Sequence, residues 1–120
     1  MDRLIRLCND QTFPHRDRII ELDIKKVNDV NLIKKEILKK NTCEANYIVA
    51  RAYLIIENDE FAYEFFLKEG AKKNNLTSIK HLILFYKEKE LEEETEKYKK
   101  LRNELLSKKS MDGMTYLMFY

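Results

Sequence analysis

Glycine and proline are nearly absent from the chain, which holds two glycines and one proline in 120 residues. Sandwiches and barrels need a sharp turn about every 8 to 12 residues, and these two residues supply many such turns. Their scarcity argues against an all-β fold and favours helices. Apolar residues make up 44% and charged residues 37% of the chain, a mixture unlike that of disordered proteins. We therefore expect a single all-α domain over residues 1–120, because this length allows one core of modest size.

Cysteines and long apolar runs are also scarce. Cys8 and Cys43 lack CxxC spacing, and residues 1–7 do not resemble a signal peptide, so we expect free thiols and a cytoplasmic protein. The longest apolar-rich stretch, Tyr47 to Ile56, is interrupted by Arg51 and is too short to span a bilayer. We therefore expect no membrane partner.

Neither sign of charge dominates, since 23 basic and 21 acidic residues leave a formal net charge of +2. Such a weak summed field does not indicate nucleic acid or an anionic membrane as the partner. Three basic segments could still contact phosphates: Lys72-Lys73, Lys99-Lys100-Arg102 and Lys108-Lys109. Glutamates are interleaved with them, so nucleic-acid binding is the weakest of the functions that we consider.

Residues that carry chemistry are few and scattered. A metal site needs several imidazole, thiolate or carboxylate ligands at geometric spacing. The candidate ligands are single: Cys8, His15, Cys43 and His81. A glycine loop that cradles phosphate cannot be built from Gly70 and Gly113, which lie 43 residues apart. We expect no catalytic residue, no metal, no cofactor and no enzyme activity.

An internal repeat is visible in the later part of the chain. Three segments share a spacing of i, i+4 and i+8 that ends on tyrosine, and these tyrosines lie 33 and 34 residues apart. The sets are Ala45, Val49 and Tyr53; Ser78, Leu82 and Tyr86; and Asp112, Tyr116 and Tyr120. An amphipathic segment with apolar residues three and four apart precedes each set: VNLIKKEILKK, EFAYEFFLKEG and EKYKKLRNELL. This period is typical of stacked helical hairpins.

We therefore predict about 7–8 helices, arranged as stacked antiparallel helical hairpins in a short tetratricopeptide-like solenoid. The parts of this domain are an N-terminal capping segment, 1–28, and three hairpin repeats, 29–56, 59–88 and 93–120. Polar turns are predicted within the hairpins at 39–42, 72–75 and 107–110. Asp59 is a candidate N-cap at the start of the middle repeat.

Two segments allow a second interpretation. The stretch ANYIVARAY, residues 45–53, is rich enough in Val, Ile and Tyr for a strand, but its place in the helical register predicts an inner helix covered on two sides. The run from Lys87 to Lys109 is mostly charged and has three apolar residues at seven-residue spacing. A coiled coil shows that spacing, yet charged residues occupy the positions between them. We favour a long solvated helix with one apolar stripe.

The middle repeat, residues 59–86, carries a recognisable set of small, aromatic and apolar residues. The matching residues are Ala62, Phe65, Phe66, Lys68, Gly70, Ser78, Leu82 and Tyr86. In this spacing they resemble the Sel-one-like repeat, a branch of the tetratricopeptide repeat superfamily, and the resemblance extends over 29–120. The turn is one residue longer than in that pattern, Glu69 replaces a small residue, and Lys73 replaces a glycine. The resemblance implies a curved solenoid whose groove or edges bind peptides and other proteins.

Aromatic and apolar residues on the repeat register are expected to pack inside: Tyr53, Phe65, Phe66, Leu82 and Tyr86. Residues off that register are expected to face outward and to contact a partner, since Tyr and Arg are favoured in interfaces. These candidate partner-binding residues are Asn46, Tyr47, Arg51, Tyr63, Lys80, His81 and Phe85. The apolar segment Tyr116 to Tyr120 is a candidate contact in a homo-oligomer.

The sequence thus predicts a non-catalytic protein-binding module or adaptor. An alternative is a small inhibitor from a phage or mobile element that blocks a host enzyme or nucleoprotein complex. Plentiful Lys, Ile and Asn suggest an AT-rich genome such as that of a low-GC bacterium or its phage, which permits this alternative without requiring it.

Overall fold

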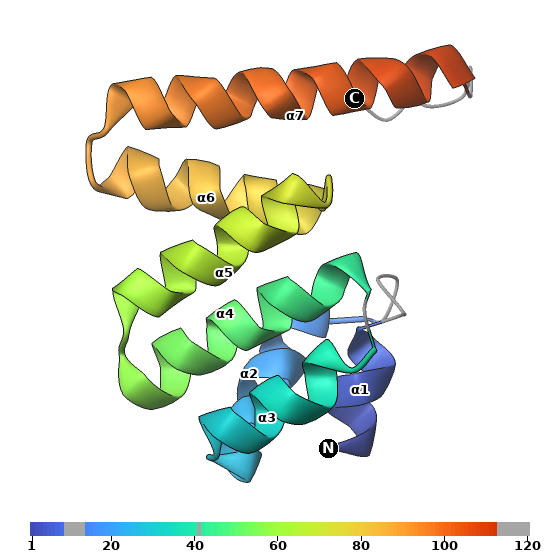
Figure 1. Ribbon diagram of the computed structural model, residues 1–120, viewed down its shortest axis with the longest axis vertical. Coiled ribbons are helices and arrows are strands. Elements are labelled where there is room, and N and C mark those ends of the chain that lie inside the picture. Colours follow the sequence, from blue (N-terminus) through green and yellow to red (C-terminus); the bar gives the residue numbers. More distant parts are fainter. Residues whose placement is uncertain (9–13, 41, 113–120) are drawn as a thin grey trace.

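The computed structural model describes residues 1–8, 14–40 and 42–112. These residues form seven helices and no strand, which confirms the predicted all-α fold of stacked helical hairpins. The helices are α1 (Asp2–Leu7), α2 (Arg16–Val27), α3 (Val30–Leu38), α4 (Cys43–Glu57), α5 (Glu60–Lys72), α6 (Leu76–Glu88) and α7 (Glu92–Asp112). The hairpins α3–α4 and α5–α6 correspond to the first two predicted repeats (Figure 1).

Side-chain caps set where three of the helices begin. Asp29 accepts a hydrogen bond from the backbone N–H of Leu32 at 3.1 Å, and Asp59 accepts one from Ala62 at 3.0 Å. Asn75 accepts from the N–H of Ser78 at 2.8 Å. Each bond satisfies a backbone donor that the first turn of a helix leaves without an intrahelical partner. The predicted N-cap at Asp59 is confirmed.

Asparagine takes the place of glycine where helices end. Asn28 and Asn58, the C-caps of α2 and α4, have φ of 49° and 52°. Asn74, in the turn after α5, has φ of 62°. Asparagine tolerates this left-handed conformation better than most residues, because its short polar side chain can hydrogen-bond locally. The chain can therefore make tight helical turns although it has only two glycines.

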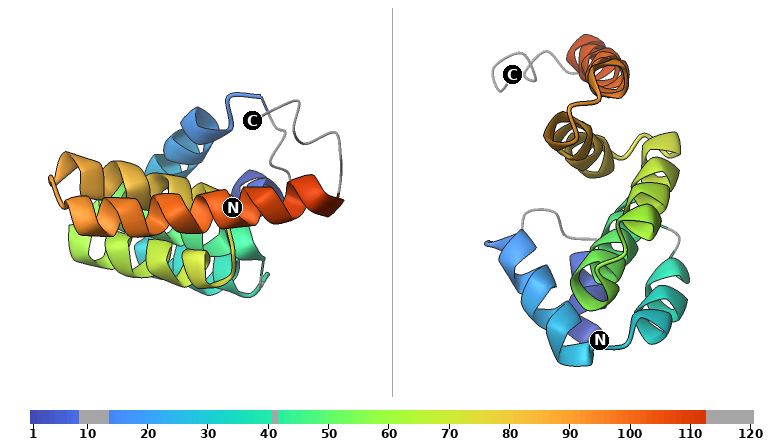
Figure 2. Two further views of the ribbon diagram at one scale, coloured as in Figure 1. Left: turned by 90° about the horizontal axis from the view of Figure 1, so that it is seen from above. Right: turned by 90° about the vertical axis from the view of Figure 1, so that its left-hand side faces the viewer.

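The stack has an inner row and an outer row of helices. From α3 onward each helix packs against the next, and in addition α2 packs on α4 and α4 packs on α6. Figure 2 shows α2 on one side of α4 and α3 on the other. The inner row is therefore α2, α4 and α6, with α4 in the middle.

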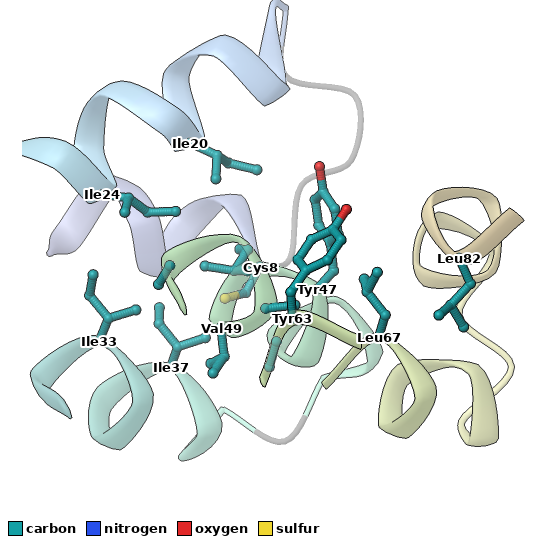
Figure 3. Packing of buried hydrophobic residues seen from close by; sticks show 14 of the residues in the cluster. Cys8, Ile20, Ile24, Ile33, Ile37, Tyr47, Val49, Tyr63, Leu67 and Leu82 are labelled. Carbon is teal, nitrogen blue, oxygen red and sulfur yellow. The ribbon is translucent and has the colours of Figure 1, made fainter. Parts of the chain in front are cut away.

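Helix α4 is the centre of the hydrophobic core. The seven residues from Glu44 to Ala50 are all buried, and side chains from the neighbouring helices converge on them (Figure 3). The prediction that ANYIVARAY is an inner helix is confirmed. Leu82 and Tyr86 are buried on α6 as predicted. Helices α5 and α6 approach closely at Gly70, where an added Cβ would lie 2.1 Å from Ser78 Oγ.

The third repeat differs from its prediction. Helix α7 continues through residues 107–110, so the turn predicted there is wrong. The segment Ser-Lys-Lys-Ser contains no glycine or proline, and its residues are tolerated in a helix. The long charged helix also begins at Glu92 instead of Lys87, because the chain turns at Glu90, whose φ is 61°. Residues 113–120, which include the predicted oligomer contact Tyr116 to Tyr120, lie outside the described residues.

One of the predicted packing residues is not in the core. Phe65 is 52% exposed, so its predicted burial is wrong. It lies on the outer face of α5, where it makes an edge contact with Phe66 at 5.1 Å between ring centroids. Phe66 and Tyr53 are half-buried and stack on each other at 5.4 Å. The outer row of a solenoid is covered on one side only, which is why an aromatic residue on its register can face water.

Candidate partner-binding groove

Three of the seven candidate partner-binding residues do not face outward. Asn46 is 4% exposed, Tyr47 is 0% exposed and Tyr63 is 7% exposed, so their predicted outward position is wrong. For Asn46 and Tyr47 the physical reason is the central place of α4, which α2, α3, α5 and α6 cover on several sides. Tyr63 lies on α5 and is covered by Phe85 of α6. Asn46 faces α5, where a Cβ added at Gly70 would lie 3.5 Å from its own Cβ.

The other four candidates are accessible. Lys80 is exposed, and Arg51, His81 and Phe85 are half-buried. The structure brings two of them against the buried tyrosines. The rings of Tyr47 and His81 lie 4.7 Å apart, and those of Tyr63 and Phe85 lie 5.7 Å apart in an edge arrangement. Five of the seven candidates therefore gather around Tyr47 and Tyr63, while Asn46 lies at the close approach of α5 and α6 near Gly70, and Lys80 is exposed one residue before His81.

Two adjoining cavities open beside this cluster. The first, of about 600 Å³, has an apolar lining from Leu54, Tyr63, Leu84 and Phe85, with charged residues of α5 and α6 at its rim. The second, of about 380 Å³, lies between the start of α2 and α6 and is lined by His15, Arg16, Asp17, Arg18, Thr77, Lys80 and His81. His81 lines both cavities. We call the two together the α2–α6 groove.

A hydrogen-bonded seam forms the floor of the groove. The hydroxyl of Tyr47 donates to Asp17 Oδ1 at 2.8 Å and lies 3.4 Å from His81 Nε2. His81 Nδ1 lies 2.8 Å from the carbonyl oxygen of Thr77, a contact that an N–H must donate. Burial lowers the pKa of His81 and raises that of Tyr47. Both rings are therefore held neutral near pH 7, and the seam ties α2, α4 and α6 together.

The charge of Arg51 acts on both tyrosines, and one of its buried N–H groups makes no hydrogen bond within the described residues. Its Nε is buried, and the described part of the chain supplies no hydrogen-bond acceptor for it. Burial raises the pKa of Tyr63, and the positive charge of Arg51 opposes that shift. In Figure 3 the hydroxyl groups of Tyr47 and Tyr63 point the same way, toward α2 and away from the aliphatic core. The positive charge of Arg51 thus acts on both tyrosines and on His81.

A buried ion pair fixes the position of the two walls. Glu44, at the start of α4, pairs with Arg16 of α2 and also accepts a hydrogen bond from Asn75 Nδ2 at the start of α6. Arg16 donates in addition to the carbonyl oxygen of Leu7 at 3.1 Å. Sequence reasoning missed Glu44, Arg16 and Asp17. The available signal was a carboxylate at the start of the most apolar helix, where burial demands a partner.

Two further findings concern other kinds of site. In residues 1–8, 14–40 and 42–112, no three His, Cys, Asp or Glu side chains gather closely enough to hold a metal ion. Within the same residues, none of the helices combines the length and the apolar character that crossing a bilayer requires.

The fold and the groove define a small all-helical protein with a stack of helical hairpins and an accessible inner face. No model of a known protein family matches the chain, and no similar protein is found among curated proteins or among solved structures. The resemblance to Sel-one-like repeats therefore rests on the residues of the middle repeat given above, and it remains an expectation.

Proposed function

We propose that the protein is a non-catalytic binding module that holds a segment of a partner protein in the α2–α6 groove. The observation that carries this proposal is the apolar cavity of about 600 Å³, which opens at the surface beside Leu84, an apolar side chain that is 52% exposed. Accessible aromatic and apolar groups next to directed polar groups are typical of protein interfaces.

The titratable groups of the groove hold its floor in shape. His81 lies between the Thr77 carbonyl, next to Nδ1, and the Tyr47 hydroxyl, next to Nε2. Asp17 accepts the hydrogen bond of that hydroxyl. A groove whose shape is fixed before binding favours the binding of a partner in one orientation.

We place this activity in the cytoplasm, in keeping with the free, buried thiol of Cys8. The adaptor and the inhibitor use the same groove and differ in what happens to the partner. An adaptor leaves the activity of its partner intact in the complex, whereas an inhibitor abolishes it.

Substitution of Leu84 tests the proposal. Leu84→Glu introduces a charge into the apolar cavity, and Leu32→Glu is a matched control on α3, where Leu32 is 40% exposed. Each variant serves as bait in a source-cell lysate at low and high salt with nuclease treatment. We expect a protein that wild type and Leu32→Glu retain at high salt and that Leu84→Glu binds at least about tenfold more weakly.

Two results would contradict the proposal. One is a partner that all three baits retain equally, which would place the binding surface elsewhere. The other is recovery of nucleic acid alone, lost at high salt, which would favour the basic segments over the groove. Once a partner is identified, its activity in the complex separates the adaptor from the inhibitor.

A further inference from the structure

We infer that the α2–α6 groove selects a peptide segment in which an acidic side chain lies within about 10 Å of a bulky apolar side chain. The inference rests on the proposed function and adds the chemistry of the partner. It follows from the two halves of the groove, which meet at His81 and differ in character.

The apolar half accepts a side chain of aromatic or large aliphatic type. Leu84 is half exposed at its edge, and Phe85 packs its edge against Tyr63 below. The rim charges alternate in sign, with Glu60 and Glu88 next to Lys87 and Lys89. Because Lys89 already pairs with Glu60, the rim presents no strong field. Apolar burial is therefore what this half offers a partner.

The basic half presents positive charge that the protein itself does not neutralise. Arg16 is paired with Glu44, and Asp17 accepts the hydrogen bond of Tyr47. Arg18 and Lys80 are exposed, and no ion pair is found for either within the described residues. In this half of the groove the two exposed cations, Arg18 and Lys80, outnumber the one carboxylate, Asp17. A carboxylate of the partner fits here by charge complementarity.

The length of the groove limits the spacing of the ligand. On α6, Thr77 of the basic half and Leu84 of the apolar half lie seven residues apart, with Lys80 between them. At about 1.5 Å per residue of helix, the distance from Thr77 to Leu84 along the helix is about 10 Å. An extended peptide covers that distance in about three residues. We therefore expect an acidic residue and an apolar residue separated by no more than about three positions.

A polyanion fits this groove less well than a peptide. Phosphates attract Arg18 and Lys80, but the adjoining half is apolar and carries Glu60 and Glu88 at its rim. A nucleic acid that continued along the groove would meet these carboxylates, which repel it. Nucleic acid is accordingly one of the outcomes of the test and not the proposed ligand.

A random peptide library tests the inference without knowledge of the natural partner. Peptides of about twelve residues, displayed on phage, are selected on the immobilised full chain, and the enriched peptides are then measured by fluorescence anisotropy. We expect enrichment of Asp or Glu within about three positions of Phe, Tyr, Trp, Leu, Ile or Met. Binding of these peptides should weaken about tenfold or more in the double variant Arg18→Glu/Lys80→Glu.

A matched variant controls for net charge. Lys35→Glu/Lys100→Glu makes the same charge change at exposed positions on α3 and α7, away from the groove. It should keep the affinity of wild type within about twofold. The groove variant should in addition select peptides with Lys or Arg in place of the acidic residue, a reversal that a loss of folding cannot produce. Circular dichroism checks that both double variants retain the wild-type helix content.

The outcomes separate failure of the inference from failure of the proposed function. If enriched peptides show no acidic preference and lose binding in Leu84→Glu but not in Arg18→Glu/Lys80→Glu, the binding module stands and the acidic partner is refuted. If no peptide is enriched and a labelled single-stranded oligonucleotide binds in a salt-dependent way that the groove variant abolishes, both are refuted. Enriched acidic and apolar peptides that respond to the groove variant alone support both.

Discussion

Helices α4 and α7 belong to the same stack but bury very different fractions of their surface. Helix α4 contacts α2, α3, α5 and α6, whereas α7 packs mainly against α6. The seven residues from Glu44 to Ala50 are all buried. In residues 92–108 of α7 the buried residues are Thr95 and Tyr98, and Leu101 and Leu105 are half-buried. An inner helix of a solenoid has neighbours on several sides and a terminal one does not. Position in the stack therefore decides how much of each helix must be apolar.

The same difference holds for charges. On α4 the carboxylate of Glu44 is buried and engages Arg16 and Asn75. On α7 the ion pair between Glu96 and Lys99 spans 3.6 Å and is exposed to water. Exposed pairs are screened and contribute little, whereas a buried charge depends on its partner. The charges that matter for the fold are thus expected to be the few buried ones near the groove.

Removing one carboxylate from each helix should give the largest contrast. Glu44→Ala leaves Arg16 buried without its partner and should lower the free energy of unfolding by about 3 to 5 kcal/mol. Glu96→Ala should lower it by less than about 1 kcal/mol. Urea denaturation followed by circular dichroism measures both. The double variant Arg16→Met/Glu44→Leu removes both charges and should recover much of the loss. Equal losses in the two single variants would refute the contrast.

Truncating one apolar side chain on each of α4 and α7 tests whether the two helices differ in how tightly their apolar side chains are packed. Ile48→Ala on α4 leaves a cavity in a fully buried site and should lower the free energy of unfolding by about 2 to 5 kcal/mol. Leu105→Ala on α7 removes a half-buried side chain at a surface that water can fill, so about 1 kcal/mol or less is expected. The same denaturation measurement applies. A larger loss for Leu105→Ala would mean that α7 is covered more than the described residues show.

The helical architecture was predictable because it depends on spacing. The tyrosine register placed Leu82 and Tyr86 inside and identified ANYIVARAY as an inner helix, as the structure has them. Spacing shows which residues share a face of a helix but not how many other helices cover it. For this reason the sequence predicts an outward position for Tyr47, which the neighbours of α4 in fact bury. The same limit accounts for Phe65, whose register is right but whose helix is covered on one side only.

The candidate groove was predictable only in part. Sequence reasoning found Lys80, His81 and Phe85, which lie together on one helix. It missed the pairing of Arg16 with Glu44, which are 28 residues apart in the sequence. Such contacts depend on how α2 packs against α4 in the folded chain, which no local sequence pattern reveals. The turn predicted at 107–110 is wrong because a local pattern was given too much weight: polar residues alone do not end a helix.

The pH dependence of the unfolding free energy gives a third and smaller test, at the contact between α4 and α6. Burial between α4 and α6 lowers the pKa of His81 below its ordinary value of 6.5. The unfolded chain therefore binds a proton at this position more readily than the folded one, so stability contributed here is present above about pH 6.5 and is lost as the pH falls below it. His81→Gln removes the titrating group and should therefore remove this loss. As the pH falls, the wild type should lose unfolding free energy relative to the variant, so that the difference between them shrinks or changes sign. Identical profiles for wild type and His81→Gln would show that protonation of His81 does not couple to folding.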